Sequence, residues 1–344
     1  MPASRIALQK HDKLERNRQK IEACIPQRLR KHRAGLVDDF RMIDISILVL
    51  AKNEVANIGQ CLEAVFGQKG AGAFEVIVVD SGSTDGTLEV ARRYPVRLEE
   101  IPAGTFHHAR TRNYAAGLAK GELLVYLAAD AFPVTENWLS AHVGNFDDER
   151  VGAVYGRHLP KRGSNFERKD ALGAVYGEER LVKEAASRER LGYRYYHMST
   201  VNAAIRQNVW AATRFPEELK VFEDLGIAKR ILDGGWKIVY EPRASVYHSH
   251  EYTTTRLFKR YFDIGYTLRQ LGIWNQMTRA SMLRDAWKLA RRKVARFGEN
   301  EDSLKAGAAL SQDLAKSAGM FLGLNERFLP LAVKRRMSAF QVYE

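Results

Sequence analysis

Two carboxylates of the 344-residue chain stand directly after apolar runs, where a parallel sheet would present them to a ligand. Asp80 follows the run 74–79, and Asp130 follows the run 123–127. Open parallel sheets bind ligands outside the carboxyl ends of their strands. Asp80 is placed to accept a hydrogen bond from a base N–H or a ribose hydroxyl. Asp130 suits a divalent ion that bridges a diphosphate, or else it is an ordinary loop residue.

Two further pairs of side chains could do chemistry. Glu223 and Asp224 open a predicted helix, and His248 and His250 close a short apolar run. The positive end of the helix dipole also explains adjacent acids at a helix N-terminus. A His-x-His pair at a strand end projects both imidazoles to one face. The pair is therefore a candidate set of metal ligands, with a purely structural role as the alternative.

Two loops of the sequence are interpreted from their local chemistry. The segment 106–113 places Arg110 and Arg112 at the start of a predicted helix. Arginines beside free helical N–H groups make an anion site. In the turn after Asp80, we interpret Thr84 and Asp85 as caps of the next helix.

The pattern of apolar residues predicts the elements that would hold these groups. Continuous apolar runs predict strands at 43–50, 74–79, 96–101, 123–127, 151–155, 201–205, 237–240 and 244–247. Helical spacing predicts helices at 56–68, 87–93, 110–119, 137–146 and 223–232, and a mostly helical region from residue 253 onward. Apolar strands that alternate with helices indicate an α/β protein with a mostly parallel sheet covered on both faces.

Composition excludes several classes of protein. A hydrophobic content of 45% is typical of a folded chain and excludes a disordered one. Cys24 and Cys61 are too few for a disulfide scaffold and lack the spacing of a zinc site. No apolar run approaches the roughly 18 residues of a membrane span. The charged N-terminus does not resemble a signal peptide, so we expect a cytoplasmic protein.

Charge is distributed unevenly along the chain. The net charge of +13 divides into +6 for residues 1–42, −2 for residues 43–255 and +9 for residues 256–344. We expect these ranges to be a basic N-terminal extension, a catalytic domain and a basic helical C-terminal region. Basic ends indicate either an anionic partner or solvated helix faces. Residues 283–297 have the spacing of a basic amphipathic helix, which would pack on the domain or bind a membrane surface.

Six motifs between residues 43 and 255 together resemble the family 2 inverting glycosyltransferases of the GT-A fold. The motifs are ISILVLAKNE (45–54), VVDSGSTDGT (78–87), ARTRNYAAGLAKGE (109–122), LAAD (127–130), FEDLGIAKRIL (222–232) and VYHSH (246–250). Each motif is weak alone, but six in this order are specific. The resemblance implies transfer of a sugar from a nucleotide-sugar donor to a saccharide or lipid-linked acceptor.

The resemblance implies where the donor binds. Asp80 would accept a hydrogen bond from the pyrimidine of the donor. Ala51 and Glu54 would line the same nucleotide pocket. Arg112 and Asn113 would lie near the diphosphate and the sugar.

The resemblance also implies a metal site and a base. Asp130 corresponds to the second acid of the D-x-D motif, and His248 corresponds to a late metal-ligating histidine of the family. We include His250 in the metal site and expect Mg²⁺ or Mn²⁺ as the cofactor. Asp224 corresponds to the general base that deprotonates the acceptor hydroxyl, and Glu223 beside it is the alternative.

Within the family, the chain is most similar to bacterial rhamnosyltransferases. Their F-x-H-G-x-x-R-N pattern, acid-poor D-x-D and H-S-H are matched by Phe106, His108, Arg112, Asn113, Ala129–Ala131 and His248–His250, with Ala109 in place of the glycine. The resemblance implies dTDP-L-rhamnose as donor, in cell-envelope polysaccharide or glycolipid synthesis at the inner face of the plasma membrane. Ala128 replaces the first acid of D-x-D, which leaves the strength of metal binding open.

Other functions compete with this interpretation of the sequence. A dinucleotide-dependent oxidoreductase needs a G-x-G-x-x-G turn after the first strand, and residues 51–59 contain none. A nucleic-acid-binding protein would explain the positive charge, but the near-neutral domain at 43–255 leaves only the ends for it. A non-catalytic protein that binds nucleotide-sugars, or an enzyme with another donor, remains an alternative.

Overall fold

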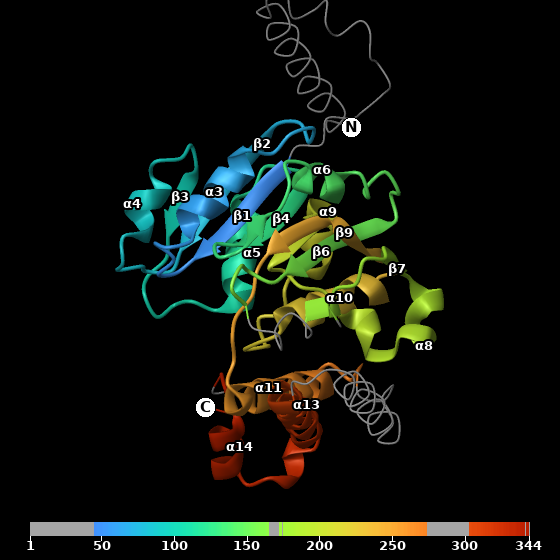
Figure 1. The fold of residues 1–344 in the computed structure, drawn as a ribbon. Coiled ribbons are helices and arrows are strands. Elements are labelled where there is room, and N and C mark those ends of the chain that lie inside the picture. Colours follow the sequence, from blue (N-terminus) through green and yellow to red (C-terminus); the bar gives the residue numbers. More distant parts are fainter. Residues whose placement is uncertain (1–44, 165–171, 174, 274–302, 341, 344) are drawn as a thin grey trace, which may run out of the picture. The chain divides into compact units, whose positions relative to one another are not determined.

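The structure is a computed structural model that describes residues 45–164, 172–173, 175–273, 303–340 and 342–343 (Figure 1). The chain divides into two units, Met1–Met42 and Ile43–Glu344. The predicted N-terminal extension and the predicted amphipathic helix at 283–297 both lie outside the described residues.

Four parallel strands form one half of the sheet. They are β1 (Ile45–Ala51), β2 (Phe74–Asp80), β3 (Arg97–Glu100) and β4 (Leu123–Ala128), in the order β3-β2-β1-β4. Each coincides with a predicted strand. In β1, β2 and β4 the reason is that strands buried on both faces are largely apolar, whereas β3 (RLEE) is a more exposed strand at the end of the order. The register pairs Ala51 with Asp80 and Leu50 with Ala128. The loops that carry the predicted donor and metal residues therefore leave the sheet at one edge.

The other half of the sheet is mixed. Strand β8 (Asn202–Arg206) runs antiparallel between β4 and β6 (Val151–Leu159), and β9 (Lys237–Tyr247) runs parallel to β6. Two short strands, β5 (Phe132–Pro133) and β7 (Leu181–Lys183), pair antiparallel with β9.

The sheet is thus mostly parallel, as predicted, with β5, β7 and β8 as exceptions among its nine described strands. Apolar runs do not encode direction, so the reversal of β8 was not predicted. Two predicted strands, at 237–240 and 244–247, are one strand, and its register against β6 shifts between Gly156 and His158.

Side chains of the central strands alternate between two hydrophobic cores, one on each face of the sheet. One core contains Leu48 and Tyr126 and is covered by α5 (His108–Leu118), α9 (Gln207–Thr213) and α10 (Glu223–Asp233). The other contains Val49 and Val125 and is covered by α3 (Ile58–Phe66), α4 (Thr87–Ala91) and α6 (Trp138–Val143). The alternation follows from the two-residue period of a strand and confirms that helices cover both faces.

Short helices connect β7 to β8. They are η1 (Ala185–Ser187), α8 (Arg188–Leu191) and η2 (Gly192–Tyr196). Lys183 at the end of β7 is almost fully buried, and its ammonium group donates to the carbonyl of His197.

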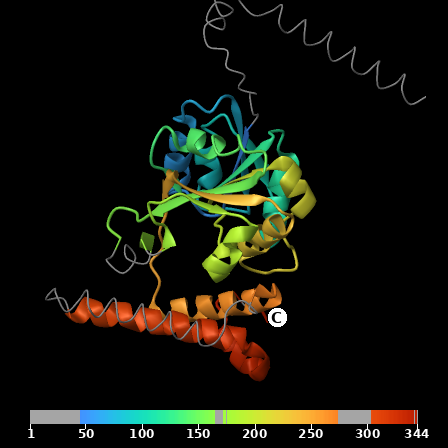
Figure 2. The ribbon, with the colours of Figure 1, turned by 90° about the vertical axis from the view of Figure 1, so that its right-hand side faces the viewer.

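The described C-terminal region is helical, as predicted. Helix α11 (Thr254–Gln270) lies alongside α13 (Ser303–Leu324), and η4 (Glu326–Phe328) and α14 (Leu331–Met337) follow (Figure 2). The two long helices touch at glycines, since a Cβ added to Gly319 would lie 2.2 Å from the Phe258 oxygen and one added to Gly323 would lie 2.0 Å from the Phe262 oxygen. None of the described helices combines the length and the apolar character that crossing a membrane requires.

Candidate active site

Three predicted metal ligands come together where β4 and β9 end. Asp130 lies in the short loop between β4 and β5, and the pairing of β5 with β9 holds it beside the residues that follow Tyr247. Oδ1 of Asp130 lies 3.3 Å from Nδ1 of His248, and Oδ2 lies 3.3 Å from Nε2 of His250. One ligand atom from each of the three residues lies within 4.8 Å of the others.

These three side chains fit a divalent ion. Two imidazole nitrogens and one carboxylate are a donor set that divalent metals accept. Nδ1 of His248 is buried and faces Oδ1 of Asp130 at 3.3 Å without regular hydrogen-bond geometry. Metal binding by Asp130, His248 and His250 remains a prediction that this geometry favours.

Charges around Asp130 favour its ionised form. Burial raises the pKa of Asp130, but the two imidazoles and Lys161 outweigh this effect and hold that pKa well below its usual range. The Nζ atom of Lys161 lies 3.6 Å from Oδ2 of Asp130 and stands 4.9 Å from the ring centroid of Phe132. Lys161 was missed by the sequence analysis, because nothing in its loop distinguishes it from other exposed lysines.

Glu54 lies within electrostatic range of this site. Burial is the main cause that raises the pKa of Glu54, and the negative charge of Asp130 adds to it. The backbone N–H of Glu54 donates to Oγ1 of Thr87, and Oε2 accepts from the amide of Asn57 at 2.6 Å. These bonds fix the loop after β1, and Ala51, the last residue of β1, is buried.

Asp80 has a local role that the sequence analysis did not foresee. It is fully buried, and Oδ1 accepts from the N–H groups of Gly82 at 2.9 Å and Ser83 at 2.8 Å. Oδ2 accepts from the hydroxyl of Ser83 at 2.5 Å. Asp80 therefore ties down the turn after β2. A contact between Asp80 and a donor base stays a prediction.

The turn after β2 is also tied to the loop after β1. Asn53, at a φ of 53°, accepts from the N–H of Thr84 at 3.0 Å, and its own N–H donates to Oγ of Ser83 at 2.7 Å. Oδ1 of Asp85 accepts from the N–H of Thr87 at 3.0 Å, so Asp85 contacts the first residue of α4. The N-cap position is held by Gly86 rather than by Thr84 or Asp85, which were predicted as caps.

The predicted base stands at the start of α10. Phe222, at a φ of 58°, turns the chain into the helix, and Oδ1 of Asp224 accepts from the N–H of Leu225 at 2.9 Å. Burial and the neighbouring Glu223 raise the pKa of Asp224, and the positive charge of Arg112 partly opposes them. A carboxylate with a raised pKa is a stronger base, which is what deprotonation of a hydroxyl requires.

Arg112 and Asn113 bind other parts of the protein. Nη1 of Arg112 lies 2.8 Å from Oε1 of Glu223. The amide of Asn113 donates to the Phe215 carbonyl and to Glu217, and its oxygen accepts from Trp210 and from the N–H of Phe215. Their predicted contacts with a donor diphosphate or sugar stay predictions, and they would require these bonds to be shared or exchanged.

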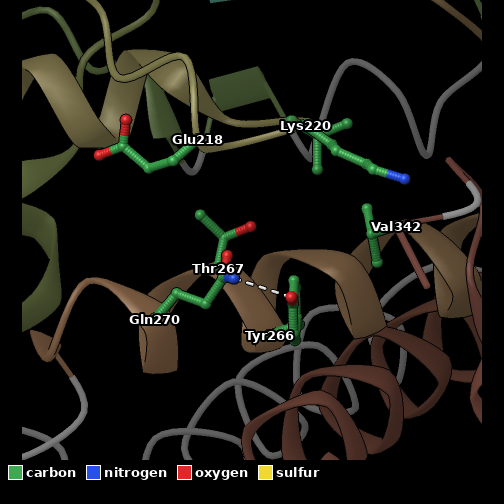
Figure 3. Close-up of a pocket in the computed structure, with 7 residues that line it drawn as sticks. Glu218, Lys220, Tyr266, Thr267, Gln270 and Val342 are labelled. Carbon is green, nitrogen blue, oxygen red and sulfur yellow. Dashed lines mark hydrogen bonds between the residues drawn. The ribbon is translucent and has the colours of Figure 1, made fainter. Parts of the chain in front are cut away.

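A small hollow of about 130 Å³ lies beside the segment that leads into the base (Figure 3). Glu218, Lys220 and Val221 line one side of it. Tyr266, Thr267 and Gln270 of α11 line another, with Val342 beside them. Nε2 of Gln270 donates to the hydroxyl of Tyr266 at 2.7 Å. The hollow is polar and borders the region just before α10.

Sequence comparison identifies relatives of known activity. The Glycosyl transferase family 2 model matches residues 46–212. The O-antigen chain rhamnosyltransferase WbaN of Salmonella anatum is 33% identical over 271 residues, which cover 78% of this chain and 85% of the relative. The O-antigen chain rhamnosyltransferase RfbN of Salmonella typhimurium is 30% identical over 272 residues, which cover 78% and 86%.

Structural comparison identifies the fold. The mannosyltransferase PcManGT from Pyrobaculum calidifontis, in complex with GDP-Man and Mn²⁺, aligns at a TM-score of 0.57 and 19% identity, covering 92% of this chain and 94% of the other. Residues 1–349 of S. aureus TarS in complex with UDP-GlcNAc align at a TM-score of 0.51 and 20% identity, covering 88% and 89%. The fold is that of the GT-A glycosyltransferases. With two relatives of this similarity and coverage, the chain belongs to glycosyltransferase family 2.

Proposed function

We propose that this glycosyltransferase transfers L-rhamnose from dTDP-L-rhamnose, with inversion, to a hydroxyl group of a growing cell-surface polysaccharide or glycolipid. The observation that carries the proposal is the pairing of a metal-type cluster, Asp130 with His248 and His250, with a carboxylate of raised pKa, Asp224. The similarity to two O-antigen rhamnosyltransferases supports the donor.

The residues of the candidate site have distinct roles in this reaction. Asp224 removes the proton from the acceptor hydroxyl as that oxygen attacks the anomeric carbon. Glu223 holds Arg112 and raises the basicity of Asp224. When bound by Asp130 and the two histidines, Mg²⁺ or Mn²⁺ supplies positive charge for the departing nucleoside diphosphate. Lys161 adds charge at the same place.

The acceptor is proposed to be lipid-linked, with the enzyme held peripherally on the inner face of the plasma membrane. Exposed apolar side chains on the C-terminal helices support this proposal, with Leu314 at 61%, Phe328 at 68% and Leu331 at 53% exposure. Arg335 and Arg336 on α14 are exposed nearby in the sequence and suit anionic lipids. Nucleic acid is not proposed as a partner.

The test is a screen of purified protein with dTDP-L-rhamnose, UDP-GlcNAc and GDP-mannose. Released nucleoside diphosphate is measured with and without saccharide acceptors, and NMR of the product reports the anomeric configuration. Turnover with dTDP-L-rhamnose and an inverted product is expected. Preference for another sugar would replace the donor. Binding of a nucleotide-sugar without turnover under any condition would favour the non-catalytic alternative.

A further inference from the structure

Arg260 of α11 carries a positive charge that the reaction described above does not use. It lies beyond residues 46–212, which the family model matches. Its guanidinium carbon stands 5.1 Å from the ring centroid of Phe222, 5.6 Å from that of Tyr252 and 5.7 Å from that of Phe340. None of the described carboxylates forms an ion pair with it. Arg260 is thus held mainly by aromatic rings.

The aromatic rings place Arg260 between the metal-type cluster and the base. Tyr252 lies two residues after His250, and their ring centroids are 6.0 Å apart. Phe222 directly precedes Glu223 and Asp224. A continuous series of contacts therefore runs from His250 through Tyr252 and Arg260 to Phe222. The positive charge of Arg260 also opposes, more weakly than Arg112, the burial and the Glu223 charge that raise the pKa of Asp224.

Phe340, the third ring around Arg260, is held in place by hydrogen bonds from its segment to Asp263. Asp263, one turn beyond Arg260 and fully buried, accepts from the N–H groups of Ala339 at 2.8 Å and Phe340 at 3.1 Å. The ring of Phe340 meets that of Phe222 edge-on, with centroids 6.1 Å apart. Cation–π contacts hold a guanidinium by its face and leave its N–H donors at the edge for a ligand.

We propose that Arg260 binds a phosphate group of a reactant between the metal site and the base. The planar fork of an arginine matches phosphate oxygens, and Arg112, the cation predicted for this role, is paired with Glu223. This rests on the proposed function, which brings phosphate to the site in two forms. One is the diphosphate of the donor, and the other is the phosphate of a lipid-linked acceptor.

The experiment compares the wild type with Arg260→Met, Arg260→Lys and Arg256→Met. Arg256 is the matched control, because it stands 5.5 Å from the ring centroid of Tyr252, a ring that Arg260 also contacts, but is exposed. Calorimetry with Mn²⁺ present measures affinity for inorganic pyrophosphate and for dTDP. Loss of one charge-assisted contact predicts affinity about tenfold lower or more for Arg260→Met, a smaller loss for Arg260→Lys and little change for Arg256→Met.

The outcomes separate the two sources of phosphate. Weaker binding of both pyrophosphate and dTDP assigns Arg260 to the donor. Unchanged binding of both, with a raised KM only for acceptors that carry a phosphate, assigns it to the acceptor. If neither changes and only the unfolding temperature falls, Arg260 merely packs the aromatic rings and the proposal is wrong.

Two further controls keep the result clear. If Arg260→Met does not fold, Arg260→Lys decides, since it keeps the charge and the stem but loses the fork. Binding requires no transfer, so a protein that binds pyrophosphate through Arg260 but turns over no nucleotide-sugar would contradict the proposed function and leave this inference standing.

Discussion

Nη1 of Arg112 lies 2.8 Å from Oε1 of Glu223, and both side chains are largely buried. Of the two adjacent acids that open α10, Glu223 is therefore the one whose charge is matched by a cation. Oδ1 of Asp224 accepts from the N–H of Leu225, and the pKa of Asp224 is raised by burial and by Glu223. This difference favours Asp224 as the proposed base and Glu223 as its proposed support.

Asp224→Asn is the direct test of the base. The change keeps the shape and removes the basicity, so we expect transfer to fall about a hundredfold or more while dTDP binding survives. In the wild type, the rate should fall as pH falls through the pKa of Asp224, and this loss should occur at higher pH than for an ordinary aspartate.

Glu223→Gln tests whether the charge of Glu223 raises the pKa of Asp224. Removal of the Glu223 charge lowers the pKa of Asp224, so the acidic limb of the pH–rate profile should move to lower pH. If Asp224→Asn turns over normally while Glu223→Gln is inactive, Glu223 is the base.

The metal site predicts a requirement for Mg²⁺ or Mn²⁺. Asp130→Ala, His248→Ala and His250→Ala each remove one donor of the cluster and should weaken Mn²⁺ binding about tenfold or more, as measured by electron paramagnetic resonance. His142→Asn is a control, because this buried histidine is hydrogen-bonded to Asn202 and lies outside the cluster. Full transfer activity in the presence of a strong chelator would show that Lys161 and other cations suffice for the diphosphate.

The sheet could be predicted from sequence because its strands carry their own signal. β1, β2 and β4 are apolar at most positions, and each was predicted to within two residues of its observed ends. The direction of β8 and the short strands β5 and β7 could not be predicted, since pairing partners distant in sequence decide them. β7 has three residues, too few for a periodic pattern.

Site residues that belong to a sequence motif could be predicted. Residues whose position depends on tertiary packing could not. Asp130, His248 and His250 were predicted together and lie together. The partners of Arg112 and Asn113 were not predictable, because Glu223 and Phe215 are more than 100 residues away in the chain. Lys161 and Arg260 reach the site from segments without any motif, and only the fold shows where their charges lie.

A membrane surface on the C-terminal helices can be tested with vesicles. The double change Phe328→Ser and Leu331→Ser removes two exposed apolar groups, and we expect weaker co-sedimentation with anionic vesicles. Each nearby Arg contributes about 1 kcal/mol at an anionic surface, so binding should also fade at high salt. Tyr114→Ser, at a site that is 42% exposed on α5, is the control. Binding that ignores the double change but requires Trp287 and Arg291 would place the contact in residues 283–297 instead.

The crossing of α11 and α13 depends on glycine. Gly323→Ala would place a methyl group 2.0 Å from the Phe262 oxygen, so the helices must separate. Overpacking of this kind costs about 1–3 kcal/mol. Gly307→Ala on the same helix meets nothing within 4 Å, and it should stabilise by up to about 1 kcal/mol through helix propensity. Urea unfolding of both variants measures the contrast, and equal effects would mean that the helices do not pack at these glycines.

Lys183 gives the protein a pH-dependent stability that can be isolated by substitution. Its side chain is buried over the ring of Tyr155, at 4.6 Å, without an ion pair to any described residue. Burial, with a smaller effect of Arg194, lowers the pKa of Lys183 from 10.5 to about 7. Between these values the unfolded chain holds the proton and the folded protein does not, so the stability contributed by this group rises with pH. The penalty is greatest below pH 7 and amounts to a few kcal/mol.

Lys183→Met keeps the length of the side chain and removes its charge. We expect the variant to be more stable than the wild type at pH 6, with a difference that shrinks steadily as pH rises toward 10. Part of the gain is offset because the His197 carbonyl loses its donor, at a cost of about 1 kcal/mol. Lys69→Met is the control, since Lys69 is 69% exposed and its surface ion pair with Glu136 contributes little. Urea unfolding at pH 6, 8 and 10 measures the difference for each variant. A difference for Lys183→Met that stays constant across this range would show that the buried amine does not change its protonation on unfolding.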